Sequence, residues 1–166
     1  TGLPRDTAWV DLSSNPSLPP DVANDSVLHL PGGLLGLAGL RKFVARGSGL
    51  RSFGRASGGF SIFRNHARMT NIDLERNAIS LVEATDFGGL AYLQELNLKG
   101  NSITNVEPGS FSPLASLKVL YLSDNPLKCL PKYGLQGLSS AHTIYMANTD
   151  LAVFPVPCKG TGCLSE

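Results

Sequence analysis

The sequence repeats with a period of 24 residues across its middle. The segments 69–92, 93–116 and 117–140 carry apolar residues at matching positions, and each has an asparagine at the same point. A fixed period of this length is typical of a solenoid, in which each repeat is one coil that buries its apolar side chains against neighbouring coils. The repeat constrains the fold strongly, because a β-sandwich would not keep so strict a phase.

The segment 69–92 shows which side chains a coil buries. Ile72 and Leu74 alternate as in a short strand, and Asn77 follows at the turn. Amphipathic helices would instead need apolar residues at i, i+3, i+4 and i+7, and Pro108 and Gly109 stand where the next such helix would continue. The predicted interior positions of this coil are Met69, Ile72, Leu74, Asn77, Ile79, Val82, Phe87 and Leu90.

The same frame extends beyond the three regular coils. We predict a single domain, 1–166, of about six coils. Its irregular coils are 7–39 and 40–68, its regular coils are 69–92, 93–116 and 117–140, and a last coil with a C-terminal cap occupies 141–166. Ser48 lies in the frame of the second coil, and Thr149 stands at the asparagine position of the last.

The repeat LxxLxLxxNxLxxLxxxxFxxLxx resembles the typical 24-residue class of leucine-rich repeats found in extracellular proteins. The resemblance implies an α/β leucine-rich-repeat solenoid, right-handed and mostly strand and loop, with a concave parallel sheet. A buried amide after each strand can donate and accept hydrogen bonds where the turning backbone loses its ladder partners. The predicted asparagine ladder is Asn15, Asn77, Asn101 and Asn125.

The strand residues that point out of the solenoid are the candidate ligand contacts. Tyr121 and Tyr145 should stack on neighbouring coils, and exposed tyrosine beside small residues is typical of binding hot spots. Charged neighbours would add register and specificity more than affinity. The alternative is that these rings only shield strand edges. The candidate concave-face contacts are Tyr121, Tyr145, Lys99, Glu75, Asn97, Asp73, Glu95 and Val119.

A basic segment offers a second hypothesis. Residues 41–68 contain no Asp or Glu, whereas acids outnumber bases seven to three in 69–125. The basic segment could bind an anion such as a sulfated glycan, or could interact with an acidic region of the same or another chain. The candidate anion-binding residues are Arg41, Lys42, Arg46, Arg51 and Arg55. With a net charge of +1, no nucleic-acid partner is expected.

Catalytic motifs are absent from the sequence. There is no HExxH, GxSxG or phosphate-cradling GxxxxGK[ST]. His29, His66 and His142 lie in different coils, and His66 occupies a core position where we expect packing rather than ligation. We therefore expect no enzyme, no cofactor and no metal site.

The segment "NPLKC", 125–129, resembles the start of the C-terminal cap of extracellular leucine-rich repeats. We expect one disulfide, either Cys158 with Cys163 or Cys129 with one of them, and a reduced set is the alternative. Asn24 begins an Asn-Asp-Ser glycosylation sequon. These features favour an extracellular or secreted protein, or the ectodomain of a membrane protein. No transmembrane segment is expected, since no 18-residue apolar window exists.

The sequence therefore predicts a non-enzymatic module that recognises a protein partner, of unknown identity, on its concave face. One alternative is a glycan- or anion-binding protein that uses 41–68. The other is a purely structural scaffold segment of a larger leucine-rich repeat protein.

Overall fold

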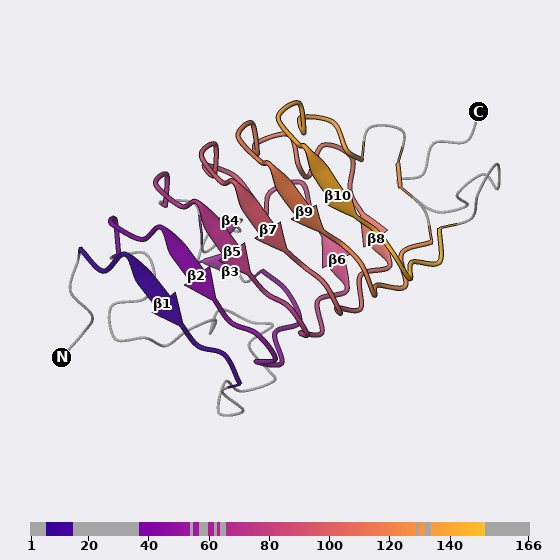
Figure 1. The fold of residues 1–166 in the computed structure, drawn as a ribbon, viewed down its shortest axis with the longest axis horizontal. Helices are drawn as coiled ribbons and strands as arrows, with labels where there is room; N and C mark the ends of the chain where they lie inside the picture. The colour runs from indigo at the N-terminus through magenta and orange to yellow at the C-terminus, as the bar shows by residue number, and fades with distance from the viewer. Residues whose placement is uncertain are drawn as a thin grey trace.

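A computed structural model shows a solenoid whose strands stack side by side (Figure 1). It describes residues 6–14, 37–53, 55–56, 60–61, 63, 66–128, 130–131 and 134–151. Within these ranges, six strands form one parallel sheet in the order in which they occur along the chain. The strands of this sheet are β1 (Trp9–Asp11), β2 (Lys42–Val44), β5 (Asn71–Asp73), β7 (Glu95–Asn97), β9 (Val119–Tyr121) and β10 (Thr143–Tyr145). The predicted parallel sheet is confirmed, whereas the extent of the domain, 1–166, stays a prediction.

Each strand meets the next at the same repeat position. Ile72 lies opposite Leu96, and Leu96 lies opposite Leu120. This central position points into the solenoid, where all three side chains are buried. The residues on either side of it point outward, because side chains alternate along a strand. The 24-residue period thus becomes a set of straight columns across the sheet.

The return path of each coil is made of turns and short strands. Two of these, β6 (Leu81–Val82) and β8 (Asn105–Val106), pair in parallel behind the main sheet (Figure 1). Phe87 and Phe111 stack there with ring centroids 5.7 Å apart and fill the back of the solenoid, as the repeat predicts. The described residues contain no helix, and hence none that could span a membrane.

The second coil, 40–68, is longer than the three regular coils and contains a hairpin. Its strands β3 (Arg55–Ala56) and β4 (Phe60–Ser61) pair antiparallel. The segment 55–61 is rich in Gly and Ser, a composition typical of flexible loops, yet its two ends pair as strands.

The amide of Asn101 links two successive coils. Its Nδ2 donates to the carbonyl of Leu98 in its own coil and to that of Leu74 in the preceding coil, both at 2.9 Å. Its Oδ1 accepts from the backbone N–H of Ile79 at 3.1 Å. The side chain is buried, so it satisfies backbone groups that water does not reach. Coils are therefore held in phase by side-chain bonds as well as by the sheet.

The same bonds recur along the solenoid. Asn77 and Asn125 each donate to a carbonyl of their own coil and to one of the coil before. Hydroxyl groups take the equivalent position in two other coils. In the second coil, the Ser48 hydroxyl donates to the Leu12 carbonyl at 2.8 Å. In the last coil, the Thr149 hydroxyl donates to the Met146 carbonyl at 3.1 Å. The predicted ladder thus forms wherever its positions are described.

Asn15, the predicted first member of the ladder, lies outside the described residues.

The residue before each ladder position adopts a left-handed backbone. In the six coils as described, φ at this position lies between 54° and 66°. The six residues are Ser14, Gly47, Arg76, Gly100, Asp124 and Asn148. Two of them are glycine, which adopts this conformation without the steric cost that a side chain brings. After three of these residues, Arg76, Gly100 and Asp124, the next side chain is the buried ladder asparagine.

Replacing Asn101 with alanine should lower the free energy of unfolding by about 2–3 kcal/mol, because it leaves buried backbone groups of two coils without partners. Urea denaturation followed by circular dichroism measures this. Asn105→Ala is the matched control, since Asn105 is only partly buried on β8 and should lose much less. Equal losses in both variants would contradict a structural role for the ladder amide.

Candidate functional site

The outward strand residues form one surface, which we call the concave face. It comprises three columns. These columns are Trp9, Lys42, Asn71, Glu95, Val119 and Thr143; Asp11, Val44, Asp73, Asn97, Tyr121 and Tyr145; and Ser13, Arg46, Glu75, Lys99, Ser123 and Ala147. All eight residues predicted as concave-face contacts lie in these columns. Their role in binding a ligand remains a prediction.

Two positions of the concave face are less exposed than the columns suggest. Val44 is only 5% exposed, although it shares the central column with Asp73 and Tyr121. Ser123 is also buried, and its hydroxyl oxygen accepts from the backbone N–H of Ala147 at 3.1 Å. The alternation of side chains along a strand predicts which way a side chain points, but not how far neighbouring residues bury it. The accessible part of the face is therefore narrower than the full set of columns.

A tyrosine pair lies at the β9–β10 end of the face. The rings of Tyr121 on β9 and Tyr145 on β10 are parallel within 5°, with centroids 4.8 Å apart. This confirms the predicted stacking, which follows from equivalent positions on paired parallel strands. Tyr145 remains 48% exposed. The pair thus offers an aromatic surface to a partner.

The pKa of the Tyr121 phenol lies above its ordinary value. Burial raises the pKa of Tyr121, and the negative charge of Glu95 raises it further. Like any tyrosine with an ordinary or raised pKa, it is protonated at neutral pH and can donate a hydrogen bond.

Arg46 binds acidic residues of its own chain. Its Nε donates to Asp73 Oδ2 at 2.7 Å and lies 4.0 Å from Glu75 Oε2. The hydrogen bond to Asp73 raises the pKa of Arg46. Arg46 thus forms ion pairs with acidic residues of the neighbouring coil. This agrees with the alternative in which the basic segment interacts with an acidic region of the same chain. Arg46 is therefore a poor candidate for binding an anion from solution.

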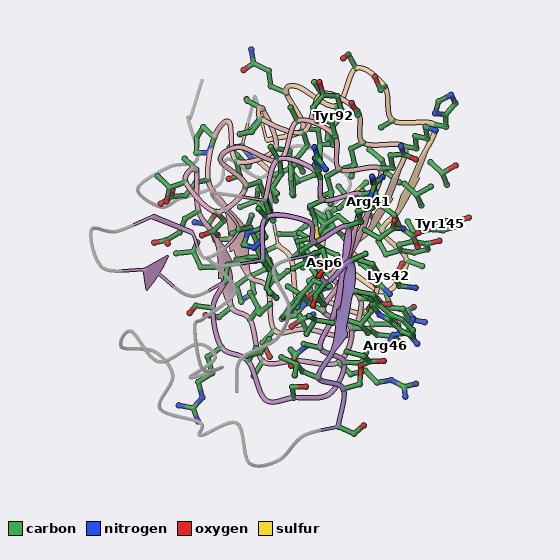
Figure 2. All side chains as sticks on the ribbon, turned by 90° about the vertical axis from the view of Figure 1, so that its left-hand side faces the viewer. Asp6, Arg41, Lys42, Arg46, Tyr92 and Tyr145 are labelled. Carbon is green, nitrogen blue, oxygen red and sulfur yellow. The ribbon has the colours of Figure 1, made fainter. Side chains whose placement is uncertain are left out.

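The five basic candidates do not lie on one surface. Arg41, Lys42 and Arg46 lie on the same side of the solenoid as Tyr145 (Figure 2). Arg51 is exposed, but it lies beyond the ladder turn of the same coil. The side chain of Arg55 is outside the described part of the chain. The described residues therefore do not assemble the five predicted anion-binding residues into one site.

The sequence reasoning did not single out Trp9 as a contact. This residue is 60% exposed at the β1 end of the concave face, and Lys42 Nζ lies 5.6 Å from the centre of its ring. The available signal was the only tryptophan of the chain at an outward strand position. Tyr92 is also exposed, at 65%, but it lies in the turn before β7, away from the other labelled residues of the face (Figure 2).

Several other predictions concern histidine, cysteine and metal sites. His66 is buried, as expected for a core position, and His142 is exposed. Among the described residues no group of His, Cys, Asp or Glu could hold a metal ion. Outside the described residues lie Asn24, Cys129, Cys158 and Cys163. The predicted glycan and disulfide therefore stay predictions.

Comparison with known proteins agrees with this geometry. Residues 91–151 match the family model described as leucine rich repeat. A solved structure, "Crystal structure of TLR13-ssRNA13 complex", is similar to this chain with a TM-score of 0.56 and 21% identity, over 70% of this chain. The chain spans 19% of the length of that protein. No curated protein matches the sequence.

Replacing Asn148 with glycine should raise the pKa of Asp124 toward its ordinary value. The Asn148 amide donates to Asp124 Oδ1 at 2.7 Å and lowers the pKa of Asp124, and Lys99, 3.5 Å away, lowers it further. Glycine suits the left-handed backbone at this position, so the variant removes the amide without backbone strain.

Carboxyl carbon NMR shifts recorded against pH measure the pKa of Asp124. Because the folded pKa is depressed, the stabilisation from this carboxylate is present above its unfolded pKa and is lost as pH falls through the folded value. An unchanged midpoint in Asn148→Gly would show that the hydrogen bond does not hold Asp124 ionised.

Proposed function

We propose that this chain, a leucine-rich repeat protein, is a non-enzymatic recognition module that binds a protein ligand on its concave face. The stacked pair of Tyr121 and Tyr145 is the observation that carries the proposal. A parallel sheet that is packed on one side and open on the other presents a broad surface to a partner. The family match and the fold support an interaction module in general, and the site on this face is the specific part of the proposal.

The tyrosine pair has the properties of a hot spot. Tyrosine has few rotatable bonds, so it loses little conformational entropy when a partner orders it. Here the stacking already orders both rings before any ligand arrives. Val119 adds apolar surface beside Tyr121 on the same strand. Burying this patch would expel water from a surface that is already rigid, which favours affinity.

The charges around the pair favour a protein over a polyanion. Asp73, Glu75 and Glu95 lie on or next to the central strands, and the Lys99 ammonium is 3.5 Å from Asp124. The similar solved structure is a complex of TLR13 with a single-stranded RNA. In this chain, Glu95 lies on the strand next to that of Tyr121, and its carboxylate would repel phosphate groups. A nucleic acid is therefore not the proposed ligand.

The proposed location is extracellular or secreted. It is supported by the cysteine positions, by the sequon at Asn24 and by the resemblance to extracellular repeats.

The double variant Tyr121→Ala/Tyr145→Ala should weaken binding of a protein partner by roughly tenfold or more, because it removes the aromatic contact area of the hot spot. Binding is measured by biolayer interferometry against a panel of purified extracellular proteins, with heparin and single-stranded RNA as polyanion probes. Tyr92→Ala is the matched control, since it removes an exposed tyrosine outside the concave face. Melting curves check that all variants are folded.

The proposal expects a protein ligand whose binding falls in the double variant and is retained in Tyr92→Ala. Binding of heparin that is lost on charge reversal of Arg46 and Arg51 would favour the anion-binding alternative. Partner binding that is intact in the double variant would favour a scaffold whose concave face has no ligand.

A further inference from the structure

Glu95 differs from its acidic neighbours on the concave face. Its Oε2 accepts a hydrogen bond from Asn71 Nδ2 at 2.8 Å, on the adjacent strand β5. The amide orients the carboxylate but carries no net charge. Within the described residues, no cation forms an ion pair with Glu95. Its negative charge is therefore fixed in direction and left without a counter-charge.

The neighbouring carboxylates are already compensated. Asp73 accepts from Arg46, and Glu75 has Arg76 Nε at 3.6 Å. Asp124, at the end of the same face, is 3.5 Å from the Lys99 ammonium. The contrast marks the Glu95 position as the part of the central sheet where a positive charge from outside would find an unpaired anion.

The same carboxylate borders the tyrosine pair. Asn97 lies opposite Tyr121 across β7 and β9, and Glu95 precedes Asn97 by two residues, so it points to the same face. Standard strand spacings then place the backbone positions of Glu95 and Tyr121 roughly 8 Å apart. The charge of Glu95 also raises the pKa of Tyr121, so the two groups interact electrostatically. Val119, directly opposite Glu95, completes an apolar floor between them.

This combination attracts a cation in two ways. The face of an aromatic ring carries negative electrostatic potential, and an oriented carboxylate carries a full charge. A guanidinium group can lie flat on a tyrosine ring and donate paired hydrogen bonds to a carboxylate, whereas an ammonium is a compact and more strongly hydrated charge. The alkyl part of an arginine side chain would cover Val119.

We infer that Tyr121, Tyr145 and Glu95 form a subsite for an arginine side chain of the partner. The inference rests on the proposed function, because it names the chemistry that the concave face recognises in a protein ligand. The partner then presents an exposed arginine to the β7–β10 end of the sheet, where charge complementarity selects it over neutral or acidic segments.

The test uses a short peptide as a defined probe. The nitrogen-15-labelled protein is titrated at low salt with acetyl-Gly-Arg-Gly-amide and followed by NMR. The same peptide with citrulline in place of arginine keeps the shape and loses the charge, and a lysine peptide keeps the charge and loses the planar group. The arginine peptide should shift the amide resonances of Glu95, Tyr121 and Tyr145, and should bind about fivefold tighter than the citrulline peptide.

The variant Glu95→Gln removes the charge and retains an oxygen that can accept from Asn71. It should remove most of the preference for arginine over citrulline and leave only the part that the tyrosine ring supplies. Glu107→Gln is the matched control. It makes the same change in net charge on the return path of the coil, where Glu107 accepts from the backbone N–H of Ala84, and should preserve the preference for arginine. Equal binding of the arginine and citrulline peptides to the wild type overturns the inference. Three other results would also overturn it. They are equal effects of Glu95→Gln and Glu107→Gln, equal affinities of the arginine and lysine peptides, and no resonance shift at millimolar arginine peptide.

Failure of the subsite can be told apart from failure of the proposed function. If the partner contacts the tyrosine pair without placing an arginine against Glu95, the double tyrosine variant loses the partner while Glu95→Gln retains it. If the concave face is not the binding surface, both variants retain the partner.

Discussion

The buried asparagine amide is the interaction on which the rest of this structure depends. At the end of each strand the backbone leaves the sheet, and its polar groups would be stranded in an apolar interior. The amides of Asn77, Asn101 and Asn125 satisfy these groups and at the same time bond to the coil before. Because these groups are buried, losing one of these hydrogen bonds would destabilise the fold, since no water could replace the missing partner. Each coil is thereby held in phase with the next.

That phase gives the concave face its chemistry. Because equivalent positions align across the sheet, a tyrosine in one coil meets a tyrosine in the next, and the two rings stack. Asn71 reaches Glu95 for the same reason, since the two residues face each other across β5 and β7. The interior positions are thus the constant part of the repeat, and the outward positions are free to vary. A partner would contact the outward residues, whose positions are fixed by the interior ones.

Much of the fold could be predicted from the spacing alone. The period predicts the parallel sheet, the columns, the ladder and the tyrosine stack, because each follows from equivalent positions in equivalent coils. Other features depend on which side chains happen to be neighbours. The ion pair of Arg46 with Asp73 joins an irregular coil to a regular one and removes a residue from the predicted anion site. The burial of Val44 and the exposure of Trp9 are likewise not predicted by strand alternation, which gives only the direction of a side chain.

The most direct test of a concave binding surface is hydroxyl-radical footprinting of the aromatic side chains, with and without a bound protein partner. Tyr121 and Tyr145 lie on that face, and the exposed Tyr92 lies in a turn outside it, so a single labelling experiment reports on both surfaces. The account predicts that partner binding lowers labelling of Tyr145 and Tyr121 and leaves Tyr92 unchanged. Protection of Tyr92 with unchanged labelling of Tyr145 would contradict it.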